Sequence, residues 1–155
     1  MVESTLHTSV KTTSVNKYPD IQVSLISRML ATEPSDRPPA QALLKHPVFW
    51  GREKTLGFLQ EVSDRVDKEE EGSVVLVSLE RKGGEVISGD WQERLEPAVR
   101  EDLRLHRSYR GRSVRDLMRA IRNKKHHYRE LTEEARALYG QMPGEFCDYW
   151  TSRSV

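Results

Sequence analysis

An amphipathic pattern after Ser113 constrains the fold of this chain more than any other stretch. Four apolar residues recur there at the i, i+3, i+4 and i+7 spacing of a helix with one face in a protein core: Val114, Leu117, Met118 and Ile121. Ser113 is a natural N-cap, because its hydroxyl can accept a hydrogen bond from a backbone N–H group of the first turn. The sequence therefore predicts a packed helix that begins directly after Ser113.

The same helix carries two polar faces. One of them holds three arginines and a histidine at helical spacing, namely Arg115, Arg119, Arg122 and His126. Asn123 and His127, four positions apart, share a neighbouring face. Both faces can therefore reach one ligand.

These residue types suit the cleavage of a phosphodiester bond in RNA. RNA carries its own nucleophile, the 2′-hydroxyl, so the reaction needs a base, an acid and cations around the phosphate, with no obligatory metal ion. Histidine can serve as acid or base near neutral pH, and the planar arginine side chain matches phosphate oxygens. Tyr109, just upstream of the helix, would be a weak base on its own. The stretch from Tyr109 to His127 is thus a candidate nuclease site.

Plainer interpretations of this stretch stay open. A run of lysines and arginines on a helix is usually a solvated face, and a non-catalytic RNA-binding or phosphate-binding face is an equal alternative. A zinc site is weaker, because His126 and His127 are adjacent rather than four apart and Cys147 is the only cysteine.

The net charge of +1 conceals a strong asymmetry along the chain. Residues 64–71 hold an acidic patch, formed by Asp64, Asp67, Glu69, Glu70 and Glu71. Between residues 100 and 129, basic residues greatly outnumber acidic ones. This polarity favours a polyanionic partner for the second half, with a solvated face or a salt-bridged dimer interface as the alternatives.

Membrane residence is not expected for this chain. No apolar run approaches the roughly 20 residues that span a bilayer, and the first residues lack the pattern of a signal peptide. A single cysteine cannot form an internal disulfide bond, so a reducing compartment is the simpler assumption.

Further helices are expected from apolar spacing, caps and helix breakers. They cover residues 20–31, about 38–46, about 56–66, 96–106, and 132–139 with Thr132 as N-cap and Gly140 as terminator. Trp91 is expected in the core, and Phe146, Tyr149 and Trp150 are expected to anchor a last packed segment. Residues 73–87 are locally typical of a β-hairpin, because valines surround a turn at Gly83 and Gly84.

The segments 113–117 and 122–131 resemble the kinase-extension nuclease domain of the inositol-requiring stress-sensor kinase of the endoplasmic reticulum. Ribonuclease L shares that domain as a more distant match. The similarity extends back through Phe49-Trp50, Glu61-Val62-Ser63-Asp64-Arg65, Leu79-Glu80-Arg81 and Asp90-Trp91, and forward to Tyr149-Trp150-Thr151-Ser152-Arg153. It covers roughly residues 18 to 153.

The resemblance implies an all-α fold: the end of a protein-kinase C-lobe followed by a helical nuclease domain that is truncated at its C-terminus. Residues 25–30, 34–38 and 46–50 resemble the last two C-lobe helices. The expected division is 1–17 disordered, 18–50 the C-lobe remnant, and 51–155 the nuclease domain without its final helix. Within it, the family favours a helix up to about Arg81, ended by Gly83 and Gly84, over the hairpin.

The family's nuclease site carries over to Tyr109, Arg122, Asn123 and His127. The resemblance implies a metal-independent reaction in which the histidine is the general acid and the tyrosine the base, with arginine and asparagine holding the phosphate. Its products would be a 2′,3′-cyclic phosphate and a 5′-hydroxyl. Further RNA contacts are expected from neighbouring basic residues of the helix, namely Arg115, Arg119, Lys124, Lys125 and His126.

The resemblance also implies partners and a location. The family cleaves RNA stem-loops in the unfolded-protein response, acts as a homodimer or higher oligomer, and works on the cytosolic side of the endoplasmic-reticulum membrane. This segment would touch no membrane itself. No cofactor is expected for RNA cleavage, since ATP and Mg²⁺ belong to an upstream kinase part whose catalytic motifs are absent here. Arg37, whose carboxylate partner in kinases is also absent, is expected to be exposed.

Two other functions remain alternatives to an active nuclease. The first is a non-catalytic fragment that acts as an RNA-binding or dimerisation decoy. The second is a structural appendage of a kinase lobe, which would bind no RNA at all.

Overall fold

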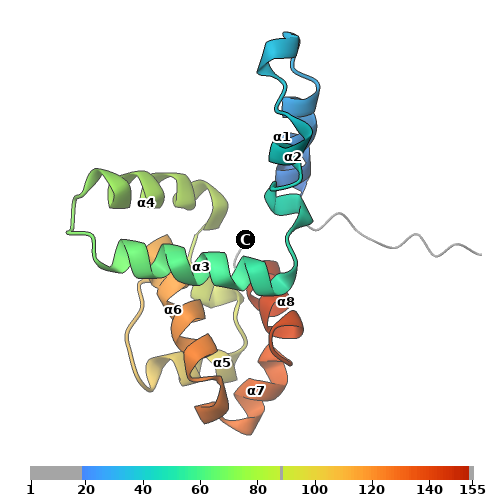
Figure 1. Cartoon of the computed structure of the whole chain (residues 1–155). Coiled ribbons are helices and arrows are strands. Elements are labelled where there is room, and N and C mark those ends of the chain that lie inside the picture. Colours follow the sequence, from blue (N-terminus) through green and yellow to red (C-terminus); the bar gives the residue numbers. More distant parts are fainter. Residues whose placement is uncertain (1–18, 88, 154–155) are drawn as a thin grey trace, which may run out of the picture. The chain divides into compact units, whose positions relative to one another are not determined.

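The computed structural model describes residues 19–87 and 89–153, and every regular element in these ranges is helical (Figure 1). The predicted all-α fold is therefore confirmed. The chain divides into two compact units between Val48 and Phe49. The disorder expected for residues 1–17 lies outside the described residues.

The first unit contains short helices. They are α1 (Pro19–Met29), the 3-10 turn η1 (Pro34–Asp36) and α2 (Ala40–Leu43), with η2 (Pro47–Phe49) at the unit boundary. The helix expected over residues 38–46 is thus regular only in its middle. Arg37 is exposed, as expected, and its Nε donates a hydrogen bond to the carbonyl of Ala31 at 2.9 Å.

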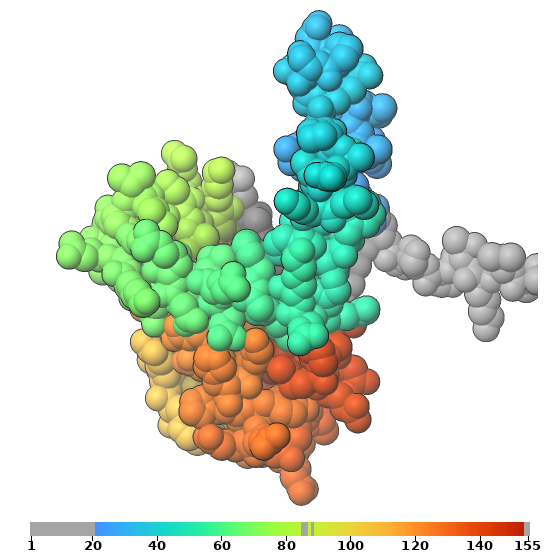
Figure 2. All heavy atoms as spheres, in the orientation of Figure 1, coloured from blue at the N-terminus to red at the C-terminus, as the bar shows by residue number. Residues whose placement is uncertain are grey.

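The second unit is a bundle in which α3 lies across α6 and α8 (Figures 1 and 2). Its elements are α3 (Arg52–Asp67), α4 (Val74–Ile87), η3 (Trp91–Arg94), α5 (Pro97–Arg104), α6 (Val114–His126), η4 (Tyr128–Glu130), α7 (Glu133–Tyr139) and α8 (Gly144–Arg153). In Figure 2 the orange and red atoms of α6 and α8 fill the space directly against the green α3. Side chains of α3 and α6 meet at three successive places, Gln60 with Lys125, Asp64 with Arg122, and Asp67 with Arg119.

Helix α6 forms where the sequence predicts it. The hydroxyl of Ser113 accepts a hydrogen bond from the backbone N–H of Asp116 at 3.1 Å, so Ser113 is the N-cap. Leu117, Met118 and Ile121 are all buried, which places the predicted apolar face in the core. A helix held by both a cap and a core can present the residues near its C-terminal end in a defined geometry.

An aromatic cluster forms the core beneath α6. Trp91, Tyr139, Phe146 and Trp150 have no exposed surface, and the ring of Tyr139 stacks on that of Trp150 with centroids 5.6 Å apart. The expected burial of Trp91 and of the α8 aromatic residues is confirmed. Aromatic pairs of this kind stabilise the fold by more than the apolar area they bury would give. This cluster therefore stabilises the packing of α5, α6 and α8.

Helix α4 departs from both sequence interpretations of residues 73–87. The hairpin is wrong and the helix is right, but α4 runs to Ile87 straight through Gly83 and Gly84 instead of ending before them. A Cβ atom on Gly83 would lie 1.8 Å from Cγ2 of Val114, at the start of α6. Gly83 therefore permits close packing of α4 on α6, which offsets the roughly 1 kcal/mol that glycine costs inside a helix.

Candidate active site

Tyr109, Asn123 and His127 line one pocket of about 350 Å³. Asn123 and His127 come from the C-terminal end of α6, and Tyr109 comes from the loop between α5 and α6. The amide nitrogen of Asn123 donates a hydrogen bond to the phenol oxygen of Tyr109 at 2.9 Å. Three of the four predicted catalytic residues thus lie together, and two of them, Asn123 and Tyr109, are joined by a hydrogen bond.

The segment around η3 holds Tyr109 in place. The side-chain amide of Gln92 donates to the carbonyl of Tyr109 at 2.6 Å, and the Trp91 ring meets the Tyr109 ring edge-on at 6.4 Å. Two residues on, the carbonyl of Gly111 accepts from the backbone N–H of Trp91 at 2.9 Å. A side chain at Gly111 would collide with Asp90, since a Cβ atom there would lie 1.8 Å from the Asp90 carboxylate. The loop that carries Tyr109 is therefore fastened to the core.

His127 is the C-cap of α6 and keeps an accessible side chain, 62% exposed. Its Nδ1 lies 2.9 Å from Oε2 of Glu130, which leaves Nε2 as the ring nitrogen available to a ligand. The backbone N–H of His127 donates to the carbonyl of Asn123 at 2.9 Å, which fixes the spacing of the two residues. His126 is exposed but is not part of this pocket.

Arg122 lies outside the pocket and is held by acidic side chains, so its predicted role as a phosphate ligand stays a prediction. Its guanidinium pairs with Asp64 at 2.8 Å and with Asp67 at 3.1 Å, its side chain is only 12% exposed, and it does not line the pocket. Both Nε and Nη2 also lie 3.4 Å from the amide oxygen of Asn123. Arg122 therefore directs that oxygen toward itself and leaves the amide nitrogen for Tyr109. Sequence reasoning missed this because the two aspartates lie 58 and 55 residues away, on α3.

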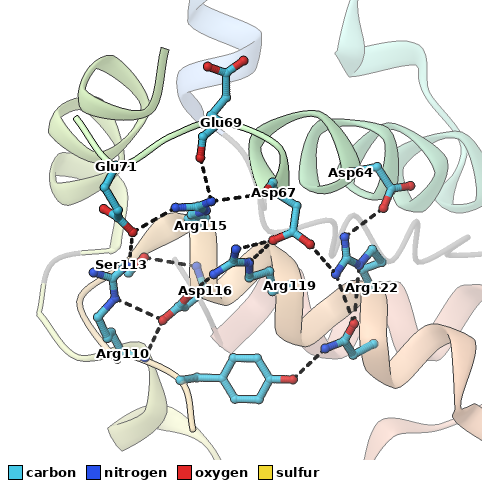
Figure 3. Close-up of polar contacts among 12 residues, drawn as sticks. Asp64, Asp67, Glu69, Glu71, Arg110, Ser113, Arg115, Asp116, Arg119 and Arg122 are labelled. Atoms are coloured by element: carbon cyan, nitrogen blue, oxygen red, sulfur yellow. Dashed lines mark hydrogen bonds and ion pairs between the residues drawn. The ribbon is translucent and has the colours of Figure 1, made fainter. Parts of the chain in front are cut away.

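The arginines of the predicted basic face belong to one polar cluster with the acidic patch (Figure 3). We call it the α3–α6 ion-pair network, and it consists of Asp64, Asp67, Glu71, Arg110, Arg115, Asp116, Arg119 and Arg122. It joins the end of α3 and the segment after it to α6 and the loop before α6. The acidic patch thus meets the basic helix within the chain.

Arg115 and Arg119, predicted as RNA-binding residues, are occupied within this network. Arg115 is only 5% exposed, and it bonds the Glu71 carboxylate at 3.1 Å and the carbonyl of Glu69 at 3.1 Å. Arg119 bonds Asp67 and, at 3.1 Å, Asp116. The predicted basic face is therefore not an open surface here, because tertiary packing brings carboxylates onto it.

The network also changes the acidity of its members. Burial by itself would raise the pKa of Asp67, but hydrogen bonds and charge from Arg119 and Arg122 outweigh it and lower that pKa. The pKa of Asp116 is likewise lowered, because the backbone N–H of Arg110 and the side chain of Arg119 bond its carboxylate against the opposing effect of burial. Burial opposes the charge of Arg119 too, yet bonds to Asp67 and Asp116 raise its pKa. These ions are thus held in their charged forms.

A carboxylate from α4 completes the start of α6. Glu80 accepts hydrogen bonds from the Ser113 hydroxyl at 2.6 Å and from the backbone N–H groups of Val114 at 2.9 Å and Arg115 at 3.2 Å. These N–H groups have no partner within the helix, and an anion at a helix N-terminus is electrostatically favoured. Glu80 therefore ties α4 to the helix that carries the site.

The remaining predicted RNA contacts have different surroundings. Lys124 is buried, and its Nζ lies 2.7 Å from the Asp102 carboxylate, which links α6 to α5. Lys125 is partly exposed and donates to the side chain of Gln60 at 2.6 Å. Only His126, and in part Lys125, offers an accessible side chain, so RNA contact by these residues stays a prediction.

Similarity to known proteins agrees with this geometry. Residues 55–154 match the family model described as Ribonuclease 2-5A. The chain belongs to the ribonuclease 2-5A family. Its relatives include the serine/threonine-protein kinase/endoribonuclease ire-1 of Caenorhabditis elegans, which is 51% identical over 83% of the chain. Another is the serine/threonine-protein kinase/endoribonuclease IRE2 of Homo sapiens, which is 48% identical over 83% of the chain. The "sensor for unfolded proteins in the ER ire1" of Schizosaccharomyces pombe is 38% identical over 86%.

The chain spans 13%, 14% and 13% of the lengths of these three relatives. The match covers the predicted nuclease region from Thr55 onward, so the resemblance to the stress-sensor nuclease domain is confirmed. Every residue of the pocket lies within the matched range. This ribonuclease 2-5A family segment therefore contains the whole candidate site described above.

Two of the pocket residues that sequence reasoning missed have basic side chains. His106 and Arg107 also line it, and both are exposed. They lie in the loop before Tyr109, where no helical periodicity points to a face. Their only signal in the sequence is their position two and three residues ahead of a predicted catalytic tyrosine.

Across residues 19–87 and 89–153, no three side chains of His, Cys, Asp or Glu gather as a metal site would require. In the same part of the chain, no helix has both the length and the apolar character to cross a bilayer.

Proposed function

We propose that this segment is a metal-independent endoribonuclease domain that cleaves RNA stem-loops by attack of the 2′-hydroxyl on the adjacent phosphate. The observation that carries the proposal is the single pocket lined by Tyr109, Asn123 and His127. The relatives are named endoribonucleases, which supports the same reaction class. The products are a 2′,3′-cyclic phosphate and a 5′-hydroxyl.

The reaction needs one proton removed and one supplied. As the 2′-oxygen bonds to phosphorus, its proton passes to the Tyr109 oxygen, which acts as the phenolate and becomes the neutral phenol. As the bond to the 5′-oxygen breaks, His127 gives that oxygen a proton from Nε2. The contact between Nδ1 and Glu130, at 2.9 Å, leaves Nε2 as the ring nitrogen that meets the 5′-oxygen. Tyr109, from the loop before α6, and His127, from the end of α6, therefore each perform one of the two proton transfers.

Asn123 supports the base. Its amide donates to the Tyr109 oxygen at 2.9 Å, so the negative charge that this oxygen carries as a phenolate, before it accepts the proton, has a fixed donor. Arg122 acts behind Asn123 by holding the amide in this orientation. In this proposal Arg122 contacts the amide and not the phosphate.

The cellular setting follows the relatives. We propose that the segment works in an unfolded-protein-response sensor on the cytosolic side of the endoplasmic-reticulum membrane, as a homodimer or higher oligomer. The name of the Schizosaccharomyces pombe relative, a sensor for unfolded proteins in the ER, supports this setting. If the dimer is the active form and dimerises weakly, activity will rise steeply with protein concentration.

The test is cleavage of a labelled RNA stem-loop in EDTA at several protein concentrations. The full chain is compared with His127→Ala and with His126→Ala, the matched exposed neighbour outside the pocket. We expect cyclic-phosphate product from the parent and from His126→Ala, and a loss of at least about 100-fold in His127→Ala, since general acid catalysis contributes on that order.

Other outcomes have defined meanings. If His126→Ala abolishes cleavage and His127→Ala does not, the assignment of the acid is wrong. If the folded parent binds the stem-loop without cleaving it, the segment is an RNA-binding decoy. If it neither binds nor cleaves, the structural-appendage alternative stands.

A further inference from the structure

Arg107 lines the pocket of Tyr109, Asn123 and His127 from the loop between α5 and α6. It lies two residues before Tyr109, whose carbonyl and ring are fastened to η3. The pocket therefore has a cation on the wall that also carries the proposed base.

The other strong cations near the pocket already have carboxylate partners. Lys124 pairs with Asp102 at 2.7 Å, and Arg122 pairs with Asp64 and Asp67. A phosphate that recruited Arg122 would have to compete with two carboxylates at once. Neither side chain is available without breaking a bond that ties α6 to α5 or α3.

Arg107 is different. Among the described residues it has no hydrogen bond and no ion pair, and its side chain is exposed. The two carboxylates that line the same pocket are Asp102, which pairs with Lys124, and Glu130, which contacts His127. The charge of Arg107 is therefore unmatched, and a phosphodiester in the pocket can engage it without displacing another group.

From this arrangement we infer that Arg107 binds the scissile phosphate. The planar guanidinium donates two parallel N–H bonds to the non-bridging phosphate oxygens. Tyr109 and His127 then meet the 2′-oxygen and the 5′-oxygen of the same phosphate. The inference deepens the proposed nuclease function and rests on it for the identity of the ligand.

The test uses two stem-loops that cannot be cleaved because the sugar at the cleavage site is 2′-deoxy. One has an ordinary anionic phosphate at that site, and the other has a neutral methylphosphonate. Binding of each is measured for the full chain and for Arg107→Ala, Arg107→Lys and Arg104→Ala. Arg104 is the matched control, an exposed arginine three residues earlier that does not line the pocket.

We expect Arg107→Ala to weaken binding of the anionic stem-loop by about 10-fold or more, as loss of a charged hydrogen-bonding pair does. Its effect on the methylphosphonate stem-loop is expected to be less than about 2-fold, and Arg107→Lys to be intermediate on the anionic one. Arg104→Ala is expected to affect both stem-loops equally, since it changes only the general attraction for RNA. Equal effects of Arg107→Ala on both stem-loops, or no effect on either, would overturn the inference.

Cleavage of the unmodified stem-loop separates this inference from the proposed function. If the parent cleaves RNA but Arg107→Ala matches Arg104→Ala in every assay, the nuclease stands and Arg107 is not the phosphate ligand. If the parent cleaves nothing but the methylphosphonate contrast holds for Arg107, the phosphate site stands and catalysis fails. A parent chain that binds neither stem-loop rejects the inference. Thermal melting of Arg107→Ala checks that the variant is folded.

Discussion

Asn123 connects the α3–α6 ion-pair network to the pocket of the candidate active site. Its amide oxygen lies 3.4 Å from the guanidinium of Arg122, and its amide nitrogen donates to Tyr109 at 2.9 Å. The side chain thus has the α3–α6 ion-pair network on one side and the pocket on the other. A change in the network can therefore alter the pocket without touching a pocket residue.

The two aspartates that bind Arg122 give a matched pair of variants. Asp67 bonds both Arg119 and Arg122 and is 28% exposed at the side chain, whereas Asp64 bonds only Arg122 and is 49% exposed. We expect Asp67→Asn to lower the free energy of unfolding by about 1 to 3 kcal/mol, because it leaves two partly buried cations with less counter-charge. Asp64→Asn is expected to cost less than about 1 kcal/mol, as exposed pairs do.

Urea unfolding of both variants measures the difference. The two aspartates share helix, chemistry and substitution, so each is the control for the other. Equal losses of stability in the two variants would mean that the second ion pair of Asp67 contributes nothing beyond a single surface pair.

At the scale of elements, the contact between α4 and α6 decides how the site helix begins. Glu80 binds the first N–H groups of α6, and Gly83, one turn later on α4, lies directly against Val114. Both contacts act on the N-terminal turn of α6, whereas the catalytic residues are at its other end. One continuous helix joins this first turn to Asn123 and His127, so contacts at its start also help to position these two residues.

Gly83 and Gly84 offer a test of this contact with adjacent residues of one helix. Gly84→Ala meets no atom within 4 Å, so it is expected to stabilise the chain by up to about 1 kcal/mol through helix propensity. Gly83→Ala forces Val114 away and is expected to destabilise the chain by about 1 to 3 kcal/mol, as overpacking does. Thermal and urea unfolding of both variants provide the measurement. Stabilisation by both substitutions would show that α4 does not approach α6 closely in solution.

At the scale of the whole second unit, carboxylates with lowered pKa values make stability depend on pH. Besides Asp67 and Asp116, Glu96 has a lowered pKa: burial would raise it, but the Tyr149 hydroxyl and Arg153 more than compensate. In the unfolded chain these groups return to ordinary values of 3.8 for aspartate and 4.5 for glutamate. As the pH falls, the unfolded chain therefore takes up these protons first.

The stabilisation from these three groups is complete above about pH 4.5 and is lost as the pH falls through their lowered pKa values. We expect the free energy of unfolding to be nearly constant from about pH 7 to about pH 5 as far as these groups are concerned, and to fall steeply below about pH 4. Urea unfolding across this range measures it. Glu96→Gln is expected to reduce the slope below about pH 4.5, and an unchanged slope in that variant would contradict the assignment of Glu96.

The sequence alone determined what depends on neighbours along the chain. The spacing of Val114, Leu117 and Ile121 and the cap at Ser113 specify α6, because helix periodicity and capping act over one or two turns. The same periodicity placed Asn123 and His127 on one face, and the short loop from Tyr109 brought the tyrosine within reach of both. For these reasons the core of the candidate site was predictable.

Only the tertiary structure decided what the charged residues do. Arg115 and Arg119 are predicted to face RNA, yet they bond groups 44 and 52 residues away, near the end of α3. Gly83 is an expected helix terminator, yet it lies inside α4, where Val114 packs against it. Arg107 has no periodic signal and enters the pocket through the path of a loop. Periodicity shows which residues share a face but not what that face meets, since the partners of a long charged side chain are set by how distant segments pack.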